Sequence, residues 1–109
     1  MTADRKQTAA EFGEAVNMSA DELERWLREE PSKAVGDKPD GGESTGRESG
    51  RHIVAILRKK TSELDDEDYA HMRKVVGYVR RHLAQRPSGD VRDTRWRYSL
   101  MNWGHDPLK

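Results

Sequence analysis

The chain has 109 residues and no cysteine, and 33% of its residues are hydrophobic whereas 37% are charged. This length allows one domain with a modest core, and the lack of cysteine excludes disulfides and cysteine-ligated zinc. The formal net charge is zero, yet residues 1–50 carry −5 and residues 51–109 carry +5, which suggests a basic working surface or two halves that attract each other.

The N-terminal part of the chain predicts a disordered start followed by a short helix. Residues 1–16 contain no apolar signal core. Residues 1–6 are predicted to be disordered, and residues 7–109 are predicted to form one helical domain. A first helix over about residues 8–16 places Phe12 and Val16 on one face. No later run approaches the length of a membrane span, so we expect a cytoplasmic protein without a membrane partner.

Ser19 and Glu22 predict the start of a second helix, because their spacing is that of a capping box. This helix covers about residues 20–30, and Pro31 lies just beyond its end. Two helices joined by a short turn have the outline of a helix-turn-helix motif. The second helix is acidic, however, whereas a recognition helix must approach phosphates, so we interpret the pair as a plain helical hairpin.

Residues 35–50 are predicted to form a glycine-rich loop between the second and third helices. Within this loop, residues 42–46 match the G-x-S-x-G pattern of a hydrolase nucleophile, but that motif requires a sheet that so short a chain cannot supply. The loop could still present backbone N–H groups and Arg47 to a phosphate. A third helix follows over about residues 51–60, and its first residue, Arg51, joins Arg47 among the candidate nucleic-acid contacts.

Residues 64–87 are the stretch around which we expect the domain to be organised. Their apolar residues recur at alternating spacings of three and four, which is typical of one face of an amphipathic helix. Asp65 stands where an N-cap is needed, and Pro87 stands where the helix would stop. The apolar face consists of Tyr69, Met72, Val75, Val76, Val79 and Leu83. We expect this face to lie in the core.

The opposite face of this central helix carries cations and one aromatic ring. At ~100° per residue, six polar or basic residues lie opposite the apolar face or flank that side. They are Arg73, Lys74, Tyr78, Arg80, Arg81 and Gln85. We expect the four cations to contact the phosphates of a nucleic acid, and the tyrosine and the glutamine to contact bases or sugars.

Residues 90–109 are predicted to form a tryptophan-containing segment with a last short helix. Asp93 or Thr94 can cap this helix, and Trp96 and Trp103 fall on one of its faces. We interpret the two indoles as core or interface anchors, while the neighbouring Arg92, Arg95 and Arg97 leave a role as base-stacking platforms as the alternative. Docking on the same domain is favoured because the modest core needs this apolar area, and docking on a second copy is the alternative.

No pattern in the sequence predicts catalysis or metal binding. His71 and His82 lie about 16 Å apart along the central helix, at ~1.5 Å per residue, so they cannot share a metal ion within one chain. Acidic residues cluster at helix starts, where capping explains them, and no nucleophile is paired with a base. We therefore expect no enzymatic activity, no metal and no cofactor.

Five blocks of the sequence resemble a known family. They are GESTGRESGR (42–51), ILRKK (56–60), HMRKVVGYV (71–79), RHLAQRP (81–87) and SLMNWGHDP (99–107). These blocks resemble a small bacterial and fungal family of domains of unknown function, whose members are often catalogued as predicted DNA-binding proteins. The resemblance covers nearly all of the chain from about residue 11. It implies DNA binding, and it carries no catalytic mechanism or mapped site.

Together these features predict an all-α fold, a small single-domain bundle of four to five helices with a glycine-rich loop between the second and the third. The function that we favour is a non-enzymatic nucleic-acid-binding protein, with DNA favoured over RNA, that contacts phosphates through the basic face of the 64–87 helix. The alternative is a helical protein–protein interaction module, as a homodimer or with another partner, whose basic face is merely solvated.

Overall fold

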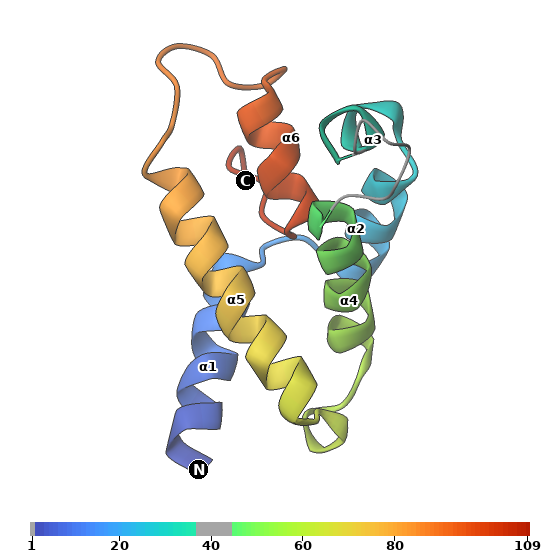
Figure 1. The fold of residues 1–109 in the computed structure, drawn as a ribbon, viewed down its shortest axis with the longest axis vertical. Helices are drawn as coiled ribbons and strands as arrows, with labels where there is room; N and C mark the ends of the chain where they lie inside the picture. Colours follow the sequence, from blue (N-terminus) through green and yellow to red (C-terminus); the bar gives the residue numbers. More distant parts are fainter. Residues whose placement is uncertain (1, 37–44) are drawn as a thin grey trace.

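Helices make up all the regular structure in the part of the chain that the computed structural model describes, residues 2–36 and 45–109 (Figure 1). The elements are α1 (Thr2–Ala15), α2 (Ala20–Leu27), α3 (Glu30–Gly36), α4 (Thr45–Arg58), the short 3-10 helix η1 (Thr61–Glu63), α5 (Asp66–Leu83) and α6 (Arg95–Asn102). This confirms the predicted small all-α bundle. The described residues contain six α-helices, however, where the sequence predicts four or five.

Helix α5 begins as the sequence predicts and ends earlier. The Asp65 carboxylate accepts a hydrogen bond from the backbone N–H of Asp68, and the Asp68 side chain accepts one from the backbone N–H of Asp65, so the two form a capping box. The helix ends at Leu83, four residues before Pro87. Gln85 therefore lies in the turn after α5 rather than on its face. Leu83, at 37% exposure, also falls outside the core.

Helix α3 is absent from the sequence-based prediction, which takes Pro31 as the end of the preceding helix. In the structure α2 ends at Leu27, and Pro31 occupies the first turn of α3. Proline is well tolerated there, because the first N–H groups of a helix have no intrahelical acceptor. The predicted single helix over residues 20–30 is therefore wrong beyond Leu27.

The start of α4 also corrects the predicted glycine-rich loop over residues 35–50. Residues 35–36 end α3 and residues 45–50 open α4, whereas residues 37–44, with most of the G-x-S-x-G match, lie outside the described residues. Gly50 serves packing rather than a turn. A Cβ at this position would lie 2.6 Å from the carbonyl oxygen of Asn102 and 2.8 Å from Leu27 Cδ2.

Three pairs of helices build the bundle (Figure 1): α1 packs on α5, α2 on α4 and α3 on α6. Helix α1 starts at Thr2, within the stretch 1–6 that the sequence predicts to be disordered. The most deeply buried apolar side chains are contributed by α2, α4, α5 and α6, together with Val91 of the segment between the last two helices. They are Leu23, Ile53, Val75, Val79, Val91 and Leu100. Among the described helices, none combines the length and the apolar composition needed to cross a membrane.

Helix α6 docks on its own domain, which confirms the favoured prediction for this segment. Of the two candidate caps, Thr94 is the one used, and its hydroxyl accepts from the backbone N–H of Arg97. Trp96 and Trp103 are 8% and 4% exposed. Just after the helix, the carbonyl oxygen of Gly104 accepts from the backbone N–H groups of residues 17 and 18, which ties the end of the chain to the connection between α1 and α2.

Candidate functional site

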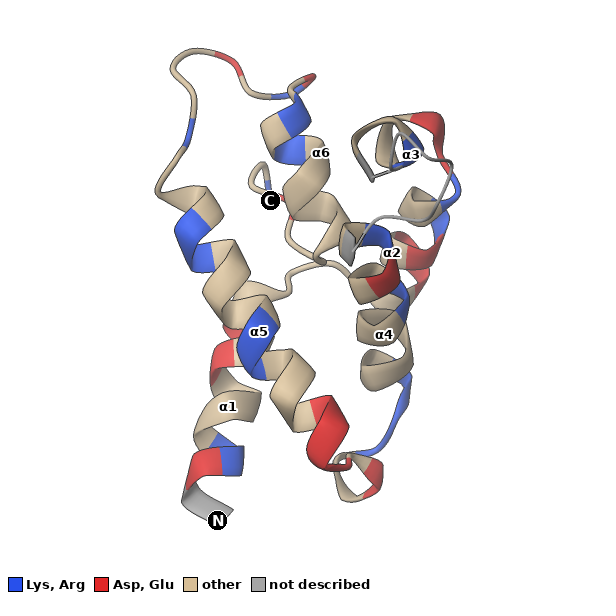
Figure 2. Cartoon of the chain, in the orientation of Figure 1, with Lys and Arg blue, Asp and Glu red and all other residues tan. Residues whose placement is uncertain are grey.

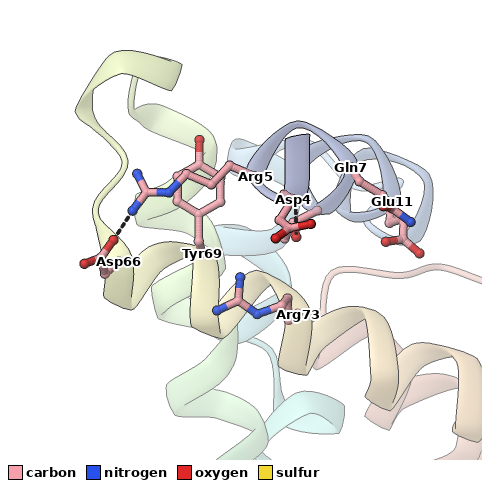
Figure 3. A pocket seen from close by; sticks show the side chains of 8 residues that line it. Asp4, Arg5, Gln7, Glu11, Asp66, Tyr69 and Arg73 are labelled. Atoms are coloured by element: carbon pink, nitrogen blue, oxygen red, sulfur yellow. Dashed lines mark hydrogen bonds and ion pairs between the residues drawn. The ribbon is translucent and has the colours of Figure 1, made fainter. Parts of the chain in front are cut away.

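The basic face predicted on α5 divides into two sides in the structure, and the side toward α1 is rich in carboxylates. Arg80 forms an ion pair with Glu11 of α1, with 2.7 Å between Nη2 and Oε2. Arg73 lines a pocket of about 580 Å³ between α1 and α5. Figure 3 shows this pocket with Asp4 and Glu11 on the α1 side and Arg73 on the α5 side.

This pocket between α1 and α5 has a mixed charge that makes it a poor site for an anion. Arg5 reaches from α1 to form an ion pair with Asp66, and its guanidinium lies over the ring of Tyr69, 4.8 Å from the centroid (Figure 3). Asp4, Glu11 and Asp66 together place three carboxylates around two arginines. A phosphate entering this pocket would be repelled by these groups as much as attracted.

The outer side of α5 carries Lys74 and Arg81, which are both exposed. They are seven residues apart, or about 10 Å along the helix axis, and so they lie on the same side. Gly77 lies between them, and a Cβ there would be 3.1 Å from Arg81 Nη1, which shows that the guanidinium folds back along the helix. Within the described ranges, neither cation has an ion-pair partner.

Arg86, in the segment just after α5, and Arg95, the first residue of α6, are two further exposed cations near the place where α6 contacts the end of α5. The indole Nε1 of Trp96 donates to the carbonyl oxygen of His82 at 2.7 Å, so the first turn of α6 touches the last turn of α5. The Arg86 guanidinium lies over the Trp96 ring, 5.5 Å from its centroid. Figure 2 shows blue segments along α5 and in the first turn of α6. We call Lys74, Arg81, Arg86 and Arg95 the basic surface.

Arg97 belongs to the structure of the C-terminal segment rather than to the basic surface. Its guanidinium donates to both carboxylate oxygens of Asp106, each at 3.1 Å, and to the carbonyl oxygen of Arg92. Both partners of the ion pair are less than one-fifth exposed. The paired guanidinium helps hold the pKa of Asp106 below its ordinary value, against the opposing effect of burial.

Tyr78 lies in a row of stacked rings instead of facing solvent as the sequence predicts. Its ring stacks on Trp103, with centroids 4.1 Å apart and an interplanar angle of 11°, and on His82, with centroids 5.2 Å apart. Along the axis of α5, His71 and Tyr78 are about 10 Å apart. The Trp103 ring stacks on both of them, with its centroid 6.2 Å from that of His71, so the indole lies between the two side chains. The row comprises His52, His71, Trp103, Tyr78, His82 and Trp96.

Arg47 and Arg51 lie at a different place from the cations of α5. They line a pocket of about 500 Å³ whose other described lining residues come from α2, α3 and α4. Arg47 Nη2 donates to the carbonyl oxygen of Leu27 at 3.1 Å. Arg28 and Lys33 add two more cations to this pocket, with Glu24 as the acidic member. The structure therefore brings these two arginines to a second location rather than adding them to the basic surface.

A polar cluster between α4 and α5 has no counterpart in the sequence-based prediction. Ser49 Oγ lies 2.8 Å from His71 Nε2, and His52 Nε2 lies 2.9 Å from Asp68 Oδ1. Lys59 Nζ donates to the other oxygen of Asp68 at 2.7 Å, and this bond is the main reason that the pKa of Asp68 falls below its usual range. Only the contact across two helices assembles this cluster, so no local sequence signal indicates it.

The polar cluster lacks the arrangement of a nucleophilic catalyst. Asp68 bonds to His52 and not to His71, which is the histidine beside Ser49, and Ser49 is only 3% exposed. Burial, together with the neighbouring His52 and Lys74, lowers the pKa of His71 to about 4. Within residues 2–36 and 45–109, no three histidine or acidic side chains are grouped as metal ligands.

These features define a small all-α protein with exposed cations on the outer side of α5, in the segment after it and at the start of α6. The chain belongs to the family described as "Protein of unknown function (DUF3140)", which matches residues 11–101. This match confirms the resemblance to a domain-of-unknown-function family. No curated protein and no solved structure matches the chain.

Proposed function

We propose that this chain is a non-enzymatic nucleic-acid-binding protein, with DNA favoured, whose basic surface contacts phosphates. The observation that carries the proposal is the exposure of Lys74 and Arg81 on one side of α5, without an ion-pair partner in the described part of the chain. Phosphate contacts supply most of the sequence-independent affinity of such proteins. DNA is favoured over RNA because DNA binding is what the resemblance of the sequence implies.

The other two cations predicted on α5 have a different charge environment from Lys74 and Arg81. Arg80 is paired with Glu11, and Arg73 faces the acidic pocket beside α1. The two sides of one helix therefore differ in charge environment. We therefore expect the phosphate contacts on the side of α5 that adjoins α6, and not at Arg73 and Arg80.

Helix stability does not explain why an arginine stands at the start of α6. Arg95 is the first residue of this helix, and the first turn contains no acidic residue. A cation there opposes the helix dipole, which favours negative charge at the N-terminus. Arg81 differs, because it lies in the last turn of α5, where a cation is favourable. Attraction of a polyanion gives Arg95 a purpose that folding does not supply.

The alternative function is an interaction module that pairs with a second copy. It requires acidic groups on the second copy that are free to form ion pairs with the basic surface. The acidic residues of α2 are the natural candidates, but all three are engaged within the chain. Asp21 and Glu24 bind Arg58, and Glu22 binds Lys109. A second copy that met the basic surface through α2 would have to displace these pairs, which favours an external polyanion over self-association through this helix.

Binding to duplex DNA, measured by fluorescence anisotropy, tests the proposal. The variant Lys74→Glu with Arg81→Glu should bind at least about tenfold more weakly than the unmodified protein. The matched control is Lys6→Glu with Arg25→Glu, which makes the same change in charge at exposed positions of α1 and α2. The control should retain affinity, and both variants should retain the melting temperature. Equal losses in the two variants would show that net charge, not the basic surface, governs binding.

A further inference from the structure

We propose that the basic surface takes a double-stranded nucleic acid rather than a single strand, an inference that rests on the proposed function. Proteins that bind single strands combine a basic groove with aromatic side chains on which successive bases stack. Proteins that bind a duplex through its backbone need cations but no free ring faces. The availability of aromatic rings beside the basic surface therefore distinguishes the two ligands.

The rings beside the basic surface are already stacked on one another. Tyr78 lies between Trp103 and His82, and His82 stacks in turn against Trp96 with an interplanar angle of 10°. The Arg86 guanidinium also lies over the ring of Trp96. No base could stack on Tyr78 or Trp96 without breaking contacts that hold α6 to α5.

The remaining phenylalanine, tyrosine and tryptophan rings are buried or have a ring partner within the chain, and all of them fall within the described residues. Trp26 pairs with Tyr98 at 5.4 Å, and its Nε1 donates to the buried Asn102 at 2.8 Å. Tyr69 is 6% exposed beneath Arg5, and Phe12 is 4% exposed. The surface therefore offers charge without a stacking platform.

The ligand that suits such a surface is one with closely spaced phosphates. A duplex presents roughly one negative charge per 1.7 Å of its axis, about twice the density of each strand. The cations of the basic surface come from α5, from the turn after it and from α6, so they are spread over more than one helix. Phosphates of both strands can contact these cations while the bases of the duplex remain stacked.

The test compares duplex DNA with oligo(dT) of the same length, which forms no pairs, at one salt concentration with the unmodified protein. We expect the duplex to bind about tenfold or more tightly than oligo(dT). Oligo(dT) should not quench tryptophan fluorescence, because no indole is free to stack on a base.

The possible results of this comparison distinguish a failure of the duplex inference from a failure of the proposed function. Failure of both polymers to bind would overturn the proposed function and the inference together. Binding of oligo(dT) as tight as that of the duplex would overturn the inference alone. Quenching of tryptophan fluorescence by oligo(dT) would do the same, because it would show that an indole leaves its internal stack to meet a base.

Discussion

The ring of Tyr78 lies flat against the indole of Trp103, with the centroids 4.1 Å apart and the planes 11° apart. This contact joins the middle of α5 to the residue that caps the end of α6. It also accounts for the raised pKa of the Tyr78 phenol, since burial disfavours the charged phenolate. The arrangement of α6 against α5, and with it the position of the basic surface, depends on this pair.

Replacement of Tyr78 should therefore affect stability before it affects binding. Tyr78→Ala removes a half-buried ring and its stacking partners, so the free energy of unfolding should fall by about 2 kcal/mol, or the melting temperature by about 10 °C. Tyr78→Phe keeps the stack and should stay within about 0.5 kcal/mol. Denaturant unfolding gives both values. An alanine variant of normal stability that loses DNA affinity would instead return Tyr78 to the role of a direct contact.

Gly50 and Gly13 should respond in opposite directions to the same substitution. Gly50→Ala puts a methyl group against the Asn102 carbonyl and Leu27, an overpacking that should cost about 1–3 kcal/mol. Gly13 lies on the exposed side of α1 with nothing within 4 Å of its Cβ position. Gly13→Ala should therefore stabilise the protein by about 0.5–1 kcal/mol through helix propensity. Similar shifts for the two variants would mean that α4 does not approach α6 this closely.

Acidification should weaken the fold through His71. In the unfolded chain this histidine takes up a proton near its ordinary pKa of 6.5, whereas in the folded protein its pKa is about 4. The unfolded state thus binds more protons between these values, so stability falls as the pH decreases from about 6.5 to 4. With allowance for solvent screening of this half-buried group, we expect a loss of about 1–2 kcal/mol.

The variant His71→Gln provides the control for this pH dependence. Glutamine can still accept a hydrogen bond from Ser49 but does not titrate, so unfolding free energies measured across this interval should depend less on pH. His82, whose pKa is also lowered by burial, contributes in the same direction and remains in the variant. The depressed pKa of Asp68 acts only at lower pH, because its carboxylate loses stabilising contacts when it becomes protonated. An unchanged pH profile in the variant would contradict the role of His71.

Local signals predict the starts of α2 and α5 in this chain. The capping box predicted at Ser19 and the N-cap predicted at Asp65 both occur in the structure, because each depends on residues only three positions apart. The end of α5 and the whole of α3 are harder to predict. Pro31 can follow a helix or begin one, and the sequence alone does not decide between these two positions.

Contacts between segments that are distant in the sequence account for the features that local sequence patterns do not predict. In the sequence, the glycines around Gly50 are typical of a loop. In the structure, Leu27 and Asn102, which lie far away in the sequence, pack against Gly50. Periodicity likewise places Tyr78 away from the apolar face of α5, but it does not show that Trp103 covers that side. The start of α6, with Arg95, is brought to the end of α5 by the bond from Trp96 to His82, which no sequence pattern predicts.

The dependence of duplex affinity on salt tests the central claim most directly. If all four cations of the basic surface contact phosphate, log K should fall against log[salt] with a slope of about −3.6. In Lys74→Glu with Arg81→Glu the slope should be about −1.8, while Lys6→Glu with Arg25→Glu should keep the full value. A slope near zero in the unmodified protein, or an undiminished slope and affinity in the first variant, would contradict phosphate binding by the basic surface.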